Sequence, residues 1–261
     1  MGLTQTIERL GQTLIRFIEE IGGMGIMLMQ AVRWLFRRPV RIWLYLQQME
    51  FVGAGSFFIV FLTGTFTGLV LSLQLLEGFG RFGAQALTGS TVAIALAREL
   101  GPVLTGLIVT GRVASAIATE LGTMRVTEQI DALYTMAVNP IQYLVVPRVL
   151  AGVIMVPILT IFFTVLGVLS SYYVVVVVMG VDAGTYMRRV NQFLKSSDLI
   201  IGLVKSVVFG LTITVVACYK GFNASGGARG VGRATTQAVV YNFIAIFILD
   251  YVLTALMYDG I

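Results

Sequence analysis

The sequence of 261 residues contains no histidine and a single cysteine, Cys218. Without histidine, the chain lacks the imidazole group that many protein zinc sites and proton shuttles use. A single cysteine cannot form a disulfide within the chain. We therefore expect that this chain is not an enzyme, that it has no catalytic residue and no metal site, and that it holds no cofactor of its own.

Motifs for nucleotide binding are also missing, although one segment is rich in glycine. Residues 221–233, GFNASGGARGVGR, contain neither GxxxxGK[ST] nor GxGxxG. We interpret this segment as a flexible cytoplasmic connection. Since most of the chain is needed for the membrane crossings described below, no ATPase domain fits in it, and any ATP-driven work must come from another chain.

Charge is the third scarce feature. Asp, Glu, Lys and Arg make up 12% of the residues, whereas 57% are apolar, and the mean hydropathy is +0.90. This composition is typical of a membrane protein. Because an apolar run of about 18 or more residues predicts a bilayer-spanning helix, the sequence predicts an all-α integral membrane protein with about five such helices. The predicted spans lie near residues 52–76, 90–118, 147–178, 199–218 and 235–258.

Local features modify two of these spans. The third is long for one crossing, and Pro147 and Pro157 predict a kinked or broken start. In the first, Gly64 and Gly68 form a GxxxG pattern, which allows helices to approach closely and is compatible with a dimer. Gln74 adds a polar group at the outer end of the same span.

The distribution of positive charge predicts the orientation. If the N-terminus is cytoplasmic, twelve of the eighteen Lys and Arg residues lie on that side, and four lie on the other. The positive-inside rule therefore favours a cytoplasmic N-terminus and, after an odd number of crossings, a periplasmic C-terminus. This asymmetry accounts for most of the net charge of +5, so we expect no nucleic-acid partner.

The first 50 residues differ from the rest, and we predict two domains, 1–50 and 51–261. Acidic and basic residues interrupt the N-terminal segment before any long apolar run, so it is not a cleavable signal. Its apolar residues recur at helical spacing, as expected of a helix that lies in the headgroup plane or, alternatively, of a soluble amphipathic helix. They are Leu10, Leu14, Phe17, Ile18 and Ile21. Trp34 and Trp43 favour the interfacial placement.

The stretch LARELGPVL, residues 96–104, places Arg98 and Glu99 inside the second predicted span. At about 1.5 Å per residue they lie about 12 Å deep, where an ionisable group costs about 2.5–3.5 kcal/mol unless it faces a partner or a wet cavity. Pro102 has no N–H for the carbonyl of Arg98, which loosens that turn. Ion pairing and a polar patch in a cavity both explain the pair, and the open helix beside it favours the cavity.

Two further charges lie at a similar predicted depth. Lys205 belongs to the fourth span and Asp250 to the fifth. The four charges sum to zero, so an intramembrane ion pair between Lys205 and Asp250 is one interpretation, and a share in the polar patch is the other.

Residues 120–140, between the second and third spans, are too polar to lie in lipid. Apolar residues can occupy one side of a helix here, and Asn139 and Pro140 would end it. A solvated surface loop is the alternative, but a helix with a docking side fits better, since connections between helices can be much shorter. Charges that could orient docking are Glu120, Arg125, Glu128 and Asp131.

At these motifs the sequence resembles the MlaE-type (MlaE/YrbE) permeases of bacterial ABC lipid transporters, which have chloroplast lipid-import relatives. The matching stretches cover most of residues 53–258, and LDYVLTALM points to the phospholipid system of proteobacteria. In chain order they are LARELGPVLTGLIVTGRVASAIATELGTMRVTEQIDAL, MAVNPIQYLVVPRVLAG, LVKSVVFG, GVGRATTQAVV and LDYVLTALM.

The resemblance implies a homodimeric permease of the bacterial inner membrane that moves phospholipid between the inner and outer membranes and so maintains outer-membrane lipid asymmetry. Its implied partners are two ABC ATPase subunits that carry ATP and Mg, a STAS-domain protein and a periplasmic hexamer of MCE domains. Residues 120–140 would be the coupling helix on the ATPase. The implied lipid site contains Arg98, Glu99, Leu71, Gln74 and Phe82.

Physical chemistry is compatible with that role, because a phospholipid needs apolar walls for its tails and a few polar groups for its headgroup. Arg98 could donate to the phosphate, and Glu99 could meet an amine or only orient Arg98. A related permease for sterols or other lipids, and a membrane scaffold whose buried charges only lock helices, are the alternatives.

Overall fold

The computed structural model describes residues 2–35, 37 and 41–258, and those residues form helices joined by short turns, with no strand among them. Five helical segments are long and apolar enough to cross a membrane, which confirms the predicted fold class. Each extends beyond the predicted span at one or both ends. The segments are Ile42–Gly80, Gln85–Val126, Ile141–Val178, Ser196–Phe222 and Gly227–Met257.

Several of these segments combine α-helical, 3-10 and π-helical elements. The first consists of α2 (Ile42–Val52) and α3 (Ala54–Gly80). The second consists of η1 (Gln85–Leu87), α4 (Thr88–Ala95), η2 (Leu96–Leu100), α5 (Gly101–Val109), η3 (Thr110–Ala114) and α6 (Ser115–Val126). The third consists of η4 (Ile141–Val145), α8 (Val146–Tyr172) and η5 (Tyr173–Val178). The fourth and fifth are α10 (Ser196–Phe222) and α11 (Gly227–Tyr258), and the remaining helices are α1 (Gly2–Leu35), α7 (Gln129–Thr135) and α9 (Ala183–Phe193).

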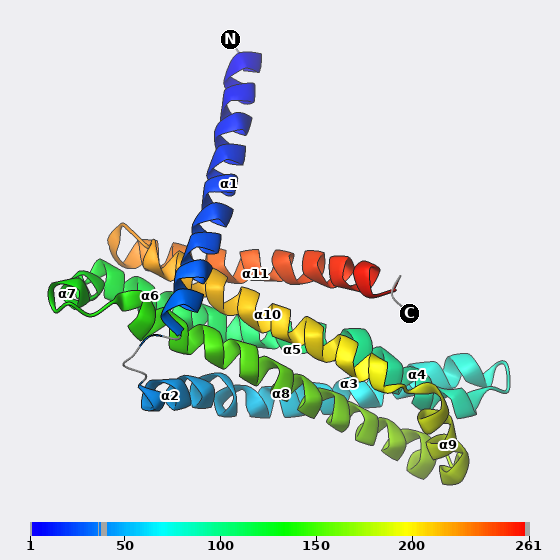
Figure 1. Ribbon diagram of the computed structural model, residues 1–261. Coiled ribbons are helices and arrows are strands. Elements are labelled where there is room, and N and C mark those ends of the chain that lie inside the picture. The colour runs from blue at the N-terminus through cyan, green and yellow to red at the C-terminus, as the bar shows by residue number, and fades with distance from the viewer. Residues whose placement is uncertain (1, 36, 38–40, 259–261) are drawn as a thin grey trace.

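The long helices run along a common direction, with α7 at one end of the bundle and α9 at the other (Figure 1). Helix α8 packs against both α3 and α10, while α11 packs against α10 and α6. The most apolar stretch of α10 is 56% buried, whereas that of α11 is only 11% buried. Helix α10 is therefore central to the bundle, and α11 leaves most of its surface uncovered.

The glycines of the first span serve a contact within the chain. Gly64 and Gly68 are buried against α8, and a Cβ atom on Gly68 would lie 2.2 Å from the carbonyl oxygen of Gly167. Only glycine lets the two backbones approach this closely. The GxxxG pattern thus joins α3 to α8, and the suggestion that it forms a dimer contact is wrong.

Helix α1 crosses the bundle direction at a steep angle, and its N-terminal end projects away from the other helices (Figure 1). Met27 and Ala31 in its C-terminal half are buried, whereas Ile18 and Ile21 are exposed. The side chains of Leu10, Leu14 and Phe17 lie outside what the structure describes. Helix α2 starts at Ile42 and joins the first span, which therefore begins inside the predicted 1–50 segment.

The third span is not broken at its prolines. Helix α8 is continuous through Pro157, and Pro147 lies in its first turn, directly after η4. The missing N–H of Pro147 removes one hydrogen bond to the preceding turn without ending the helix. The irregular part of the start is the π-helical turn η4, which precedes Pro147.

Two predicted connections are organised differently from the predictions. A single helix over 120–140 is wrong, because α6 ends at Val126, Glu128 has a φ of 60°, and the short helix α7 follows. A flexible segment over 221–233 is also wrong, because α10 continues to Phe222 and α11 starts at Gly227. In both places helix caps near glycine or polar residues interrupt a chain that is otherwise helical.

Candidate functional site

The stretch LAREL forms the π-helical turn η2 in the middle of the second span. The N–H of Gly101 donates to the carbonyl oxygen of Leu96, five residues earlier, and Pro102 has no N–H to continue the ladder. The hydroxyl of Thr164 on α8 donates to the same Leu96 oxygen at 3.5 Å. A π turn widens the helix by one residue and is frequent at functional sites, so the sequence places its two charges where the helix departs from α geometry.

Lys205 on α10 is the centre of a cluster of polar groups inside the bundle. Its side chain is 0% exposed, and its ammonium group donates to Asp250 Oδ1 at 2.9 Å and to Thr254 Oγ1 at 2.7 Å, both on α11. It also donates to Glu99 Oε2 on η2. The Thr254 hydroxyl in turn donates to the backbone oxygen of Asp250 at 2.7 Å and lies 3.4 Å from Glu99 Oε2.

This cluster provides an acceptor for each of the three donors of Lys205, but the single lysine does not neutralise both carboxylates. A buried ammonium is tolerated when its three donors have acceptors, and Lys205 has three. The side chains of Glu99 and Asp250 remain 38% and 22% exposed, and together they carry one more charge than the lysine can neutralise. The cluster therefore presents negative charge at the surface of the bundle, beside α11.

Arg98 belongs to a different pair from its neighbour Glu99. Its Nη1 lies 3.6 Å from Oδ1 of Asp198, which is buried at the start of α10. The second carboxylate oxygen of Asp198 accepts from the backbone N–H of Lys195 at 2.9 Å. Adjacent residues on a helix point about 100° apart, so the two charges of LAREL reach two separate networks.

Each of the two networks contains a residue that was not predicted from the sequence. Asp198 lies in the first turn before an apolar run, where an acidic residue is typical of a helix start. Thr254 follows Asp250 by four residues, so the two share one face of a helix. Both signals were present in the sequence, and the structure joins them to Arg98 and Lys205.

The predicted pocket wall is only partly brought together. Leu71 and Gln74 line an open groove of about 370 Å³ on α3, together with Phe66, Thr67 and Val70. Phe82 lies beyond the end of α3 and is 84% exposed. The groove belongs to α3 alone, whereas the Lys205 cluster belongs to η2, α10 and α11.

The four charges proposed for docking fall into different environments. Glu120 accepts from Nη2 of the buried Arg148 at 2.8 Å, and Arg125 pairs with Asp131 at 2.6 Å across the break between α6 and α7. Glu128 is exposed in the break itself. Glu120 is therefore tied to α8, while the other three lie around α7.

A second buried lysine anchors α1. Lys220 near the end of α10 lies 2.8 Å from Oε1 of Glu20, and its ammonium stands 3.9 Å from the centre of the Tyr241 ring. Glu20 was not predicted to have a partner. Among the described residues, no group of three or more His, Cys, Asp and Glu side chains is arranged to hold a metal ion.

Comparisons with known proteins agree with this architecture. The family model "Permease MlaE" matches residues 45–256. A protein of Rickettsia bellii named "Probable ABC transporter permease protein" is 44% identical over 95% of this chain and 96% of its own. The Haemophilus influenzae "Intermembrane phospholipid transport system permease protein MlaE" is 36% identical over 97% of this chain and 98% of its own.

A plant protein is similar over a smaller part of its length. "Protein TRIGALACTOSYLDIACYLGLYCEROL 1, chloroplastic" of Arabidopsis thaliana is 40% identical over 82% of this chain and 61% of its own. The match to the family model and the near full-length relatives lead to one conclusion: this chain belongs to the MlaE permease family.

Proposed function

We propose that this MlaE-family chain is the permease subunit of an ATP-driven ABC transporter that moves phospholipid between the inner and outer membranes and so maintains outer-membrane lipid asymmetry. The names of the Haemophilus and Rickettsia relatives support transport. The observation that carries the proposal is the Lys205 cluster, in which partly exposed carboxylates lie inside a membrane-spanning bundle. Charges that only lock helices together would be expected to neutralise each other.

The polar groups around η2 suit a phospholipid headgroup. Arg98 keeps part of its guanidinium exposed beside Asp198, so it can donate to a lipid phosphate. Glu99 has an exposed edge that can accept from an amine while Lys205 holds the other edge. The groove lined by Leu71 and Gln74 offers an apolar wall for the lipid tails, and Phe82 would lie at its outer rim.

A homodimer would complete this site. Helix α11, which carries Asp250, exposes a row of large apolar side chains. Glu99 and Asp250 cannot face hydrocarbon without a large cost, so a second copy that encloses a wet cavity would shield them. The exposed residues are Val240, Ile244, Phe247, Ile248, Tyr251, Val252 and Leu256.

The chain would act with ATPase subunits that bind ATP and Mg, with a STAS-domain protein and with a periplasmic MCE hexamer. We place it in the bacterial inner membrane with a cytoplasmic N-terminus and a periplasmic C-terminus, as the charge asymmetry favours. In this orientation α7 is cytoplasmic, and the exposed Tyr134 in α7 and Met136 directly after it offer an apolar contact to an ATPase. Arg125, Glu128 and Asp131 would orient that contact, while Glu120 supports α8.

The test is ATP-dependent transfer of a fluorescent phospholipid between vesicles by the reconstituted transporter. Arg98→Gln should lower the transfer rate about tenfold or more, since a charged hydrogen bond contributes about 1.5–3 kcal/mol. Arg81→Gln is the matched control, because Arg81 is an exposed arginine that pairs with the exposed Glu77. Unchanged transfer by Arg98→Gln would favour the scaffold.

Loss of the ion pair with Asp198 is a second way in which Arg98→Gln could act. The double variant Arg98→Gln, Asp198→Asn removes both charges together and leaves no unpaired buried carboxylate. Transfer should stay low in the double variant if Arg98 binds lipid, and restored transfer would mean that Arg98 only holds Asp198. Mass spectrometry of co-purified lipid separates phospholipid from sterols and other lipids.

A further inference from the structure

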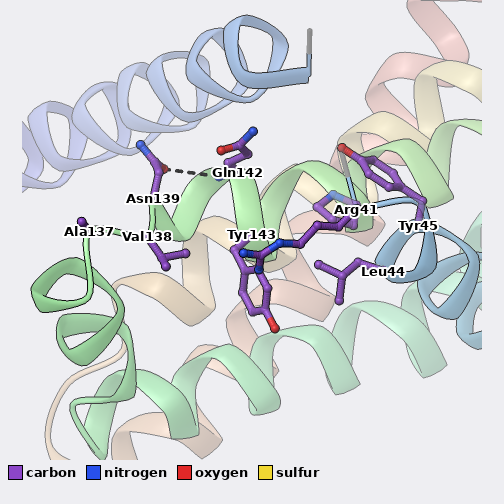
Figure 2. Close-up of a pocket in the computed structure, with 9 residues that line it drawn as sticks. Arg41, Leu44, Tyr45, Ala137, Val138, Asn139, Gln142 and Tyr143 are labelled. Atoms are coloured by element: carbon purple, nitrogen blue, oxygen red, sulfur yellow. Dashed lines mark hydrogen bonds between the residues drawn. The ribbon is translucent and has the colours of Figure 1, made fainter. Parts of the chain in front are cut away.

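A hollow of about 150 Å³ lies between the start of α2 and the turn that joins α7 to η4. It is far along the bundle from η2, at the end where the first and third spans begin (Figure 1). Figure 2 shows Arg41 extending across the hollow toward Tyr143, with Asn139 and Gln142 on the opposite wall. None of the residues placed in the lipid transport site lines it.

The wall of the hollow is held in place by the backbone. After α7 the N–H groups of Ala137 and Val138 donate to the carbonyls of Tyr134 and Leu133, both at 3.0 Å, which is the Schellman pattern with Ala137 at the left-handed position. Asn139 Oδ1 then accepts from the N–H of Ile141 at 2.9 Å and caps η4. These hydrogen bonds within the chain hold the wall in place without a ligand.

The hollow contains hydrogen-bond donors, although the amide N–H₂ of Gln142 donates to the carbonyl oxygen of Arg37 at 2.9 Å. Arg41 is the charged residue among those that line it, and its guanidinium lies 5.1 Å from the centre of the Tyr143 ring. Within the described part of the chain, Arg41 makes no ion pair. Because Asn139 uses its oxygen to cap η4, its amide N–H groups remain for a ligand. The positive charge of Arg41 together with the amide N–H groups of Asn139 suits an anion.

The position of the hollow identifies the source of that anion. The apolar parts of the first and third spans begin at Ile42 and Ile141, directly beside Arg41 and Asn139. Trp43, 70% exposed, marks the membrane interface. Phosphate groups of lipids lie at this level, and basic pockets between membrane helices bind anionic headgroups. The volume admits a phosphate group but not a whole lipid, so the tails would lie outside, along the exposed Ile42 and Leu46 of α2.

We infer that the hollow between Arg41, Asn139 and Tyr143 binds the phosphate of an anionic lipid from the leaflet on the N-terminal side. The bound lipid fastens α2 to the turn after α7. This site is separate from the transport site around η2, and it holds a lipid that stays with the protein.

The two tryptophans of the chain make the site directly measurable. They are Trp34 and Trp43, both close in sequence to Arg41, so fluorescence quenching by lipids with brominated chains reports on this end of the molecule and not on η2. The full-length chain in nonionic detergent is titrated with brominated phosphatidylglycerol, and brominated phosphatidylcholine corrects for lipid that only enters the micelle. Quenching should saturate at a lower concentration of phosphatidylglycerol than of phosphatidylcholine.

Two variants test the residues. Arg41→Gln should raise the half-saturating concentration of phosphatidylglycerol about tenfold, because it removes a charged donor. Asn139→Asp keeps the oxygen that caps η4 but adds a negative charge, and it should weaken binding at least as much. Arg33→Gln is the matched control, since Arg33 is an exposed arginine on the same side that does not line the hollow, and it should change binding less than twofold.

Three outcomes would overturn the inference. Arg41→Gln and Asn139→Asp could both bind like the unchanged chain, or phosphatidylcholine could quench as well as phosphatidylglycerol. In the third, inorganic phosphate would displace phosphatidylglycerol at equal concentration, which would identify a soluble phosphate compound as the ligand. A thermal melt of each variant shows whether it is folded before titration.

Discussion

Buried Lys and Arg side chains lie at two levels along the bundle, and the number of carboxylates that contact each of them differs. At the middle level Lys205 contacts two carboxylates, Glu99 and Asp250, which leaves negative charge in excess. At the end near α7, Arg148 and Lys220 each contact one carboxylate. The middle level is thus unbalanced, while the end level consists of separate one-to-one pairs.

This difference distinguishes a cluster that can bind a ligand from ion pairs that hold helices together. Each end pair joins two helices. Arg148 on α8 pairs with Glu120 on α6, and Lys220 on α10 pairs with Glu20 on α1. In each pair one positive charge meets one negative charge, so neither sign is in excess. The middle cluster has one carboxylate more than its lysine can neutralise, which is expected of a site that a ligand or a wet cavity completes.

Removing the lysine of the middle cluster should have the largest effect on stability. Lys205→Met leaves two carboxylates facing each other beside a buried methionine, and breaking a buried pair in this way costs about 3–5 kcal/mol. Thermal melts in detergent should show a large loss of stability. We also expect Lys205→Met and Asp250→Asn to be non-additive, because they share one interaction.

The matched control for this variant neutralises the acids as well. In Lys205→Met, Glu99→Gln, Asp250→Asn no charge remains unpaired, so most of the lost stability should return. Lipid transfer should not return, since the polar acceptors proposed for the headgroup are gone. A triple variant that restores transfer would show that the middle cluster is structural like the end pairs.

Breaking the ion pair between Arg148 and Glu120 should cause the second-largest loss of stability. Glu120→Gln leaves the buried guanidinium with its bond to the Leu144 carbonyl at 2.7 Å but without a counter-charge. Because Glu120 is half-exposed and partly screened, we expect a loss of about 1–2 kcal/mol in the same melts. Glu128→Gln, an exposed glutamate in the same connection, should change stability by less than about 0.5 kcal/mol. Equal effects would remove the distinction between Glu120 and the other charges around α7.

The long helices were predictable because a bilayer imposes a simple rule. Any backbone within hydrocarbon must satisfy its own hydrogen bonds, so apolar runs become helices whatever their neighbours. The five spans follow from this rule, and so does the depth that Lys205 and Asp250 share. The meeting of these two side chains with Glu99 needs the rotation of three helices about their axes, which hydropathy does not specify.

The features that were predicted wrongly from the sequence have local causes. Gly64 and Gly68 carry no information on whether their neighbour is another copy or, as found, Gly167 of the same chain. The break at Glu128 depends on a left-handed residue that is not glycine, so no glycine or proline marks it in the sequence. Conversely, the glycines of residues 227–233 are held in a helix that packs on α6, where tertiary contacts outweigh their poor helix propensity.

The smallest effect should come from the pair that anchors α1. Glu20→Gln removes the charge that meets Lys220 at 2.8 Å, but Lys220 keeps the ring of Tyr241 and a contact with Gln237 at 3.5 Å. We therefore expect less than about 1 kcal/mol in global melts, as for partly exposed ion pairs. The local effect should be larger, because α1 has few buried side chains apart from Met27 and Ala31. Hydrogen exchange in α1 should accelerate several-fold in Glu20→Gln and stay unchanged in Glu19→Gln, whose carboxylate is exposed one residue away. Equal exchange in the two variants would show that packing alone holds α1, and the end level would then contain one structural ion pair instead of two.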